Sequence, residues 1–147
     1  MRRHVLRPEL SEARRRGFHN IGSAASVTGI SAKMIRHYES IGLIPAAHRT
    51  VAGYRVYSES DLHRLRFIKR ARRLGFSTSQ IGVLLGLWDN RQRTSREVKK
   101  LVREHVRELG LKISEMQAMQ RTLESLAVQC HGDQRPDCPI LEDLERH

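Results

Sequence analysis

The sequence predicts a mainly α-helical protein in which a winged helix-turn-helix domain precedes a long coiled-coil helix and a short cysteine-containing loop. Three observations support this prediction. A helix, a glycine turn and a second helix follow one another around Gly29, and a hydrophobic repeat of threes and fours runs unbroken from about 93 to 128. The only two cysteines of the 147 residues lie eight positions apart near the end. Aromatic residues make up 5% of the chain, so a large hydrophobic core is not expected.

The positive charge is unevenly distributed along the chain. The formal net charge is +11, which favours a polyanionic partner. Residues 20–88 carry ten basic and three acidic side chains, whereas residues 98–147 carry eight basic and nine acidic ones. The sequence therefore predicts a nucleic-acid-binding part in the first two-thirds and a second part with a different role.

Residues 1–18 form a basic extension with six arginines and two glutamates. They contain no apolar run, so they do not resemble a secretory signal, and no stretch of the chain is apolar for long enough to span a membrane. We predict that the extension is disordered, with a short helix over residues 8–16 as the alternative. We also expect a cytoplasmic protein with no membrane contact.

Residues 20–42 predict two short helices around a tight turn. Small residues suit a first helix, Gly29 tolerates the positive φ of a turn, and Ser31 can cap a second helix from 32 to about 41. This is the helix-turn-helix pattern. Lys, Arg and Tyr side chains reach phosphates or base edges, and the candidates on the second helix are Lys33, Arg36 and Tyr38.

Residues 46–57 predict a β-hairpin that serves as the wing. The segments 50–51 and 54–57 have strand character, and Ala52-Gly53 can form the turn between them. A two-stranded ribbon cannot bury itself, so it must pack on helices or contact a partner. The wing residues that we expect to contact DNA are Arg49, Tyr54 and Arg55.

Two further helices complete the first domain, which we assign to residues 19–88. Ser58 to Asp61 is a capping-box pattern, and the helix that follows reaches about Leu74 before Gly75. Ser77 to Gln80 offers a second capping pattern, ahead of a short apolar helix that ends near residue 88.

Residues 89–128 are assigned to a dimerisation helix. Apolar residues recur at steps of three and four, which is the seam of a coiled coil. A helix of this length spans roughly 50 Å and would leave its apolar stripe exposed in a monomer. We therefore expect a homodimer, with the two long helices antiparallel.

The remaining segment, residues 129–147, contains both cysteines. Cys130-His-Gly-Asp-Gln-Arg-Pro-Asp-Cys138 is rich in turn-forming residues, and Pro139 suits the first position of a short helix. Two thiolates on one loop fit a soft metal ion. A disulfide and a thiol redox switch are the alternatives, although closely spaced cytosolic cysteines more often bind metal or react.

This order of parts resembles the MerR family of transcription regulators. The matching segments are Ile21-Gly22, Met34-Ile35-Arg36-His37-Tyr38-Glu39, Gly42-Leu43-Ile44-Pro45 and Gly53-Tyr54-Arg55-Val56-Tyr57, followed by Leu65-Arg66-Phe67-Ile68 and Leu74-Gly75-Phe76-Ser77. The ending Cys130-x7-Cys138-Pro139-Ile140-Leu141 resembles the copper-sensing, CueR-like branch. The sequence departs from the family pattern in its basic extension, in Ala52 before the wing glycine, and in lacking a Cys- and His-rich tail.

The resemblance implies that Cys130 and Cys138 hold one Cu(I) per subunit in linear coordination, with Ag(I) or Au(I) as alternatives. Regulators of divalent ions in this family carry a cysteine at the start of the long helix, where this chain has Ser95. A hydroxyl cannot replace a thiolate for Zn(II) or Hg(II). His131 and Asp137 neighbour the cysteines, but residues next to a ligand rarely point at the same ion.

The mechanism implied by the resemblance is allosteric. The dimer binds double-stranded promoter DNA together with RNA polymerase, and metal binding bends and untwists the DNA so that copper-resistance promoters are activated. An enzyme is not expected, because the sequence has no phosphate loop, catalytic carboxylate pair or spaced Cys-His pair. A thiol redox regulator of the same fold and a copper-buffering protein are the other interpretations.

Overall fold

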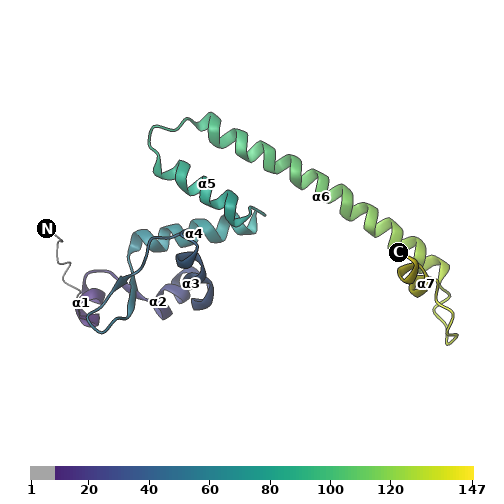
Figure 1. Cartoon of the computed structure of the whole chain (residues 1–147), viewed down its shortest axis with the longest axis horizontal. Coiled ribbons are helices and arrows are strands. Elements are labelled where there is room, and N and C mark those ends of the chain that lie inside the picture. The colour runs from purple at the N-terminus through teal and green to yellow at the C-terminus, as the bar shows by residue number, and fades with distance from the viewer. Residues whose placement is uncertain (1–8) are drawn as a thin grey trace. The chain divides into compact units, whose positions relative to one another are not determined.

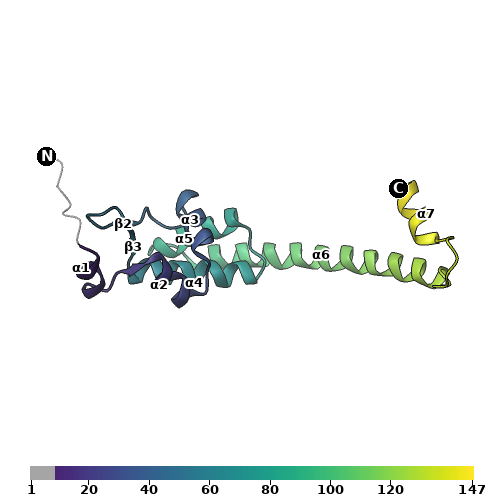
Figure 2. The ribbon, with the colours of Figure 1, turned by 90° about the horizontal axis from the view of Figure 1, so that it is seen from below.

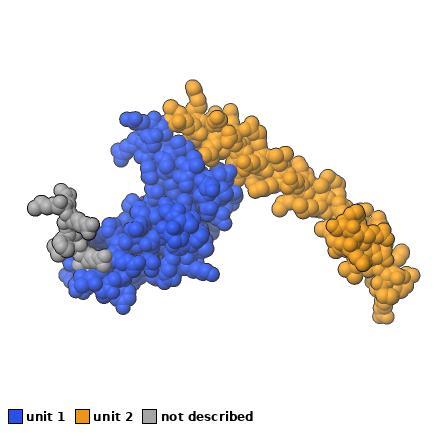
Figure 3. Space-filling view, viewed as in Figure 1, with its two compact units in different colours: residues 1–93 blue, residues 94–147 orange. Residues whose placement is uncertain are grey.

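A computed structural model describes residues 9–147, which form two units: residues 9–93 and residues 94–147 (Figure 3). The first unit contains five helices and a small sheet in its described residues, and the second contains a long helix and a short one (Figure 1). The predicted mainly helical architecture, with a winged helix-turn-helix and a long helix, is confirmed. The boundary between the units falls after Arg93, a few residues beyond the expected end of the first domain at residue 88.

Part of the extension that we predicted to be disordered is folded. Helix α1 (Leu10–Arg15) is followed by Gly17 at φ 84°, and the Phe18 N–H donates to the Ala13 carbonyl at 2.9 Å. Ala13 is fully buried. Tertiary burial of this kind stabilises a helix that is too short to persist alone. The structure therefore shows the alternative that we kept open, a short helix within residues 8–16, in place of disorder for this segment. Residues 1–8 lie outside the described residues.

The predicted helix-turn-helix forms from α2 (Ile21–Thr28) and α3 (Ala32–Ser40). The Asn20 side chain accepts the Ser23 N–H at 2.7 Å and begins α2, and Ser31 caps α3. Gly29 ends α2 in the left-handed region at φ 70°. Lys69 Nζ lies 3.3 Å from the Thr28 carbonyl oxygen, so a lysine covers the end of α2 where helix carbonyls lack partners.

The wing belongs to a three-stranded antiparallel sheet of order β1-β3-β2, formed by β1 (His19–Asn20), β2 (His48–Arg49) and β3 (Arg55–Tyr57). The register pairs Arg49 with Arg55 and Asn20 with Val56. The predicted hairpin is present, but Thr50 and Val51 lie outside β2, in the connection to β3. Strand β1 was not predicted, because two residues carry no detectable alternation.

Both predicted capping boxes are present. Ser58 begins α4 (Glu59–Arg73) and Ser77 begins α5 (Thr78–Asp89), each exchanging hydrogen bonds with the third residue of its helix. Helices α2, α3 and α4 pack together with β3, and α5 packs on α4. The core of this unit has fully buried side chains from every one of these elements and from the loop after α3, namely Ala24, Ile35, Ile44, Val56, Tyr57, Leu62, Leu65, Ile68 and Ile81.

The second unit consists of α6 (Ser95–Gln129) and α7 (Pro139–Arg146), which packs against it. The middle of α6 carries a stripe of exposed apolar side chains, among them Ile113 (56% exposed), Met116 (67%) and Leu123 (56%). In a single chain nothing among the described residues covers this stripe. None of the helices in residues 9–147 combines the length and the apolar character needed to cross a bilayer.

The buried Tyr57 predicts a loss of stability at high pH. Burial, followed by the negative charge and hydrogen bond of Glu39, raises the pKa of Tyr57 to about 12. The unfolded chain ionises this phenol near pH 10, so the stabilisation is fully present below pH 10 and is lost as the pH rises to about 12. Two pKa units correspond to about 2–3 kcal/mol of unfolding free energy. Tyr57→Phe should lose less stability over this window than the wild type.

Urea unfolding followed by circular dichroism, at pH 9 and again above pH 11, tests this prediction. All other ionisable groups are the same in the two proteins, so the difference between wild type and variant isolates Tyr57. Parallel losses of stability in the two proteins would contradict the assignment.

Candidate metal loop and nucleic-acid interface

The second helix of the helix-turn-helix presents a basic face. On α3, Ile35 and Tyr38 are buried, whereas Lys33 and Arg36 are exposed. Tyr38 is only 5% exposed and its ring belongs to the core, so a contact with DNA through its hydroxyl stays a prediction. The spacing could have revealed this, because Tyr38 follows Ile35 by three positions and such residues share one face of a helix.

The turn of the wing is held rigidly by its own backbone. The Thr50 N–H donates to the Tyr54 carbonyl, and the Gly53 N–H donates to the Thr50 carbonyl, both at 2.9 Å. Gly53 has φ 87°, a conformation that side chains other than glycine adopt rarely. Tyr54 is 64% exposed beside this turn and is free to meet a partner. Arg49 Nη1 donates to the Gly53 carbonyl at 2.8 Å, which directs part of this side chain inward.

Glu39 joins α3 to the wing, a role that the sequence did not reveal. Its Oε1 accepts the Ala47 N–H at 3.1 Å, and its Oε2 accepts the Tyr57 hydroxyl at 3.2 Å. Arg55 Nε also lies 3.2 Å from Oε2, in an ion pair with a carboxylate that is only 14% exposed. The helix and the wing are therefore fixed to each other, and Arg55 is partly occupied with this internal contact.

The two cysteines lie at the two ends of one exposed loop. Cys130 follows the last residue of α6 and its N–H donates to the Leu126 carbonyl at 3.2 Å. Cys138 immediately precedes α7, and its carbonyl accepts the Glu142 N–H at 3.1 Å. Both are half-buried free thiols rather than a disulfide. The amide end of the eight-residue α7 favours negative charge, which suits a thiolate at Cys138.

The other polar side chains of the loop add no soft metal ligand to the two cysteines. Asp133 accepts from the Arg135 backbone N–H at 2.9 Å and from its Nε at 2.8 Å, and this pairing with Arg135 lowers the pKa of the Asp133 carboxyl. His131 and Asp137 are exposed. Within residues 9–147 no three His, Cys, Asp or Glu side chains gather where they could hold an ion together. The donor set thus fits an ion that accepts two soft ligands and does not fit tetrahedral zinc.

Ser95 is the first residue of α6 and is exposed. The preceding Thr94 N–H donates to Glu97 Oε2 at 3.0 Å, which fixes the start of the helix. The 35 residues of α6 separate Ser95 from the cysteine loop by roughly 50 Å within one chain. A side chain at position 95 can therefore meet a cysteine loop only if that loop belongs to another subunit.

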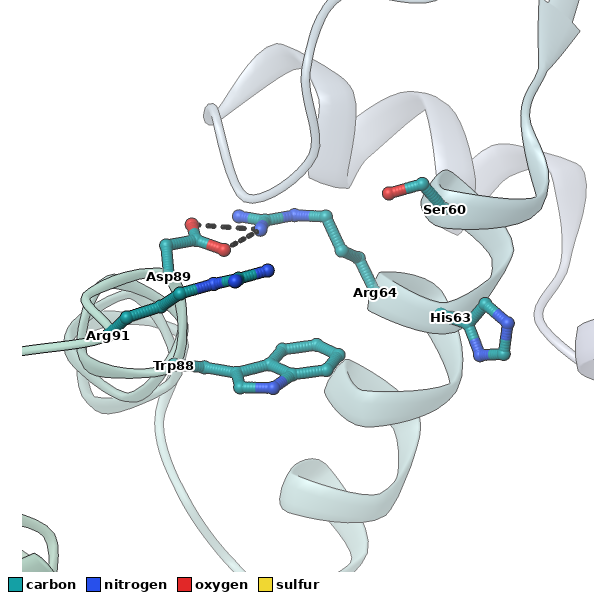
Figure 4. A pocket seen from close by; sticks show the side chains of 6 residues that line it. All are labelled: Ser60, His63, Arg64, Trp88, Asp89 and Arg91. Atoms are coloured by element: carbon teal, nitrogen blue, oxygen red, sulfur yellow. Dashed lines mark hydrogen bonds and ion pairs between the residues drawn. The ribbon is translucent and has the colours of Figure 1, made fainter.

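An open cleft of about 550 Å³ on the first unit was not anticipated from the sequence. It is lined by Ser60, His63, Arg64, Trp88, Asp89 and Arg91 (Figure 4). Arg64 Nη1 lies 2.9 Å from both carboxylate oxygens of Asp89, and the Trp88 ring stacks on Phe67 at 5.0 Å. None of the predicted metal or DNA residues lines this cleft, so it is separate from both candidate sites.

Comparisons with known proteins identify the fold family. The family model described as "MerR HTH family regulatory protein" matches residues 19–86, and the one described as "MerR, DNA binding" matches residues 62–126. The chain is 55% identical over 125 residues to heavy metal-dependent transcription regulator 2 of Rhizobium meliloti, covering 85% of each protein. It is 40% identical to the transcriptional regulator CueR of Escherichia coli O6:H1, covering 85% of this chain and 93% of CueR.

A solved structure agrees with these matches. The transcription regulator PbrR691 from Ralstonia metallidurans CH34, in complex with lead(II), superposes with a TM-score of 0.73 at 32% identity, covering 86% of this chain and 98% of PbrR691. The chain therefore belongs to the MerR family of helix-turn-helix transcription regulators.

Proposed function

We propose that this protein is a Cu(I)-responsive dimeric regulator, also open to Ag(I) and Au(I), that activates copper-resistance promoters by metal-dependent distortion of DNA. The observation that carries the proposal is the pair of free, half-buried thiols at Cys130 and Cys138, one at each end of a single loop. Relatives described as heavy metal-dependent regulators support metal responsiveness in general.

The donor set argues for a monovalent soft ion. Two thiolates satisfy Cu(I), whereas zinc takes four ligands from Cys, His or carboxylate. The nearby Asp133 carboxylate is occupied by Arg135, so it offers no additional charge at the ends of the loop. When bound, one ion per subunit would link the two thiolates and so close the loop.

The two cysteines are well situated to transmit this closure. Cys130 is continuous with α6, and Cys138 begins α7, which packs on α6. Drawing the two thiolates together fixes where α7 starts relative to the end of α6. We infer that α7 can take two positions on α6, one without metal and one with it. The metal-bound position is the activating one.

The exposed apolar stripe of α6 supports a homodimer. Val106, Ile113, Met116, Met119 and Leu123 are each at least 56% exposed in the single chain, and they recur at helical spacing. A continuous stripe of this kind is typical of a surface that another chain covers. Antiparallel pairing of two α6 helices would bring position 95 of one subunit close to the cysteine loop of the other.

The proposed DNA-binding surface consists of the exposed face of α3 and the wing. Lys33 and Arg36 offer free positive charge on α3, and Tyr54 is exposed beside the turn of the wing. Glu39 fixes the two elements to each other, so they would engage promoter DNA as one rigid body. Sequence preference would then come partly from how easily the DNA bends, with RNA polymerase acting at the same promoter.

Metal selectivity at position 95 gives a testable prediction. Ser95→Cys should add a thiolate from the partner subunit to the two thiolates of the loop. We expect the variant to bind Zn(II) or Hg(II) at least tenfold more tightly than the wild type, which corresponds to about 1.4 kcal/mol. Ser95→Ala is the matched control and should behave as the wild type. Equal divalent affinities in Ser95→Cys and Ser95→Ala would contradict antiparallel pairing.

Native mass spectrometry of the reduced protein tests the proposed function as a whole. The spectrum should contain a dimer that takes up one Cu(I) or Ag(I) per subunit and no stoichiometric Zn(II). A protein that binds no metal, yet activates transcription after peroxide treatment in the presence of a copper chelator, would support the thiol redox regulator instead.

A further inference from the structure

Helix α1 (Leu10–Arg15) is an element of this chain that the family does not account for. The family model for the helix-turn-helix begins at residue 19, so α1 lies ahead of it. In both views of the ribbon α1 lies beside the wing hairpin of the first unit (Figures 1 and 2). We therefore ask which partner the outer surface of α1 contacts.

Several contacts fix α1 in this position. Ala13 is fully buried on its inner side, and Gly17 at φ 84° turns the chain into β1. The Phe18 ring meets the edge of the His48 ring of β2, with ring centres 5.3 Å apart and planes at 75°. His19 Nε2 lies 2.7 Å from Glu59 Oε1 at the start of α4. The helix is thus held against the sheet.

The outer side of α1 carries two uncompensated positive charges. Arg14 and Arg15 are exposed, and the described part of the chain gives neither of them an ion-pair partner. Arg16 differs, because it pairs with Glu12 one turn earlier on the same surface. Arg15 lies two positions from the buried Ala13, which on a helix places it on nearly the opposite side.

The wing itself offers less free charge than its composition indicates. Arg49 donates to the Gly53 carbonyl, and Arg55 is paired with Glu39. The exposed guanidinium groups of α1 are therefore a further source of free positive charge beside the hairpin. Arginines that face outward next to a DNA-contacting wing complement the charge of the phosphate backbone.

We propose that α1 is an additional DNA contact, in which Arg14 and Arg15 bind phosphates of the duplex next to the wing. The contact is with the backbone, so it strengthens binding without reading bases. This inference rests on the proposed DNA-binding function of the first unit. It assigns to the extension a role in the affinity of the complex and in its footprint.

The test is the salt dependence of DNA binding by Arg14→Ala/Arg15→Ala in the full chain. The probe is a duplex selected by the wild-type protein from a random-sequence library, with binding followed by fluorescence anisotropy over a series of salt concentrations. Removing two phosphate-binding side chains should reduce the slope of log K against log salt by about 1–2 and weaken binding, while base preference stays the same.

Two variants serve as controls. Arg14→Lys/Arg15→Lys keeps the charge and should retain the wild-type slope, whereas Arg16→Ala removes an arginine already paired and should change the slope little. Circular dichroism checks that each variant is folded. Wild-type binding with an unchanged slope in the double alanine variant would overturn this inference alone. Failure of the wild type to bind any duplex would overturn the proposed DNA-binding function as well.

Discussion

Cys130→Ser and Cys138→Ser, made one at a time, should each abolish activation of transcription by Cu(I) while leaving DNA binding nearly unchanged. A single remaining thiolate cannot hold the ion in two-coordinate geometry, so we expect the loss of activation to be complete rather than partial. The loop lies at one end of a 35-residue helix and none of the proposed DNA contacts belongs to it, so the affinity for DNA should stay within about twofold of the wild type.

Transcription and DNA-binding assays on the same preparations measure both parts of this prediction. Gln134→Ala is the matched loop control, because Gln134 is an exposed residue of the loop and its replacement leaves both thiols in place. This variant should respond to Cu(I) like the wild type. Loss of DNA binding by either serine variant would mean that the cysteines hold the fold together instead of sensing metal.

Lys33→Ala/Arg36→Ala should weaken DNA binding more than any other pair of surface changes on the first unit. Both side chains are exposed on α3, and removing a side chain that binds a phosphate should reduce the salt slope by about 0.9. If one of them reaches a base edge, its removal also costs about 1–3 kcal/mol of discrimination at that position. Anisotropy at several salt concentrations, on selected and on random duplexes, separates the two contributions.

Replacing Arg55 should affect the stability of the fold as well as DNA binding, unlike replacing Lys33 and Arg36. Arg55→Ala would leave the Glu39 carboxylate, which is 14% exposed, without its ion-pair partner, so its effect on DNA binding is mixed with an effect on stability. Thermal unfolding should therefore show a lower midpoint for Arg55→Ala than for Lys33→Ala/Arg36→Ala.

The assigned DNA-binding face of α3 depends on the Lys33→Ala/Arg36→Ala variant. Wild-type affinity and salt slope in that variant would contradict the assignment.

Local signals in the sequence predicted most of the helical framework. Ser31, Ser58 and Ser77 each occupy the cap position that was expected of them, and Gly29 has the left-handed conformation that the turn requires. These features depend on neighbours within three or four residues, and such interactions can be read from spacing. The long repeat of α6 was recognisable for the same reason.

Features that depend on distant residues were missed. Strand β1 is two residues long and exists only because β3 pairs with it. Helix α1 was expected only as the alternative to disorder, because its stability depends on the burial of Ala13. Glu39 collects its partners Ala47, Arg55 and Tyr57 from other elements, so no local pattern could reveal its role. The cysteine pair was found because both donors belong to one short loop.

Run-off transcription by the reduced wild-type protein in a series of metal ions decides whether this protein responds to monovalent soft ions. The template carries, within a promoter, the duplex that the wild-type protein selects from a random-sequence library. Cu(I), Ag(I) and Au(I) should activate transcription, because Cys130 and Cys138 offer two soft ligands. Zn(II) should not, because it takes four ligands, and Hg(II) should not, because position 95 offers a hydroxyl where regulators of divalent ions carry a cysteine. Activation by Zn(II) at concentrations where Cu(I) is silent would show that the protein is not a Cu(I)-responsive regulator.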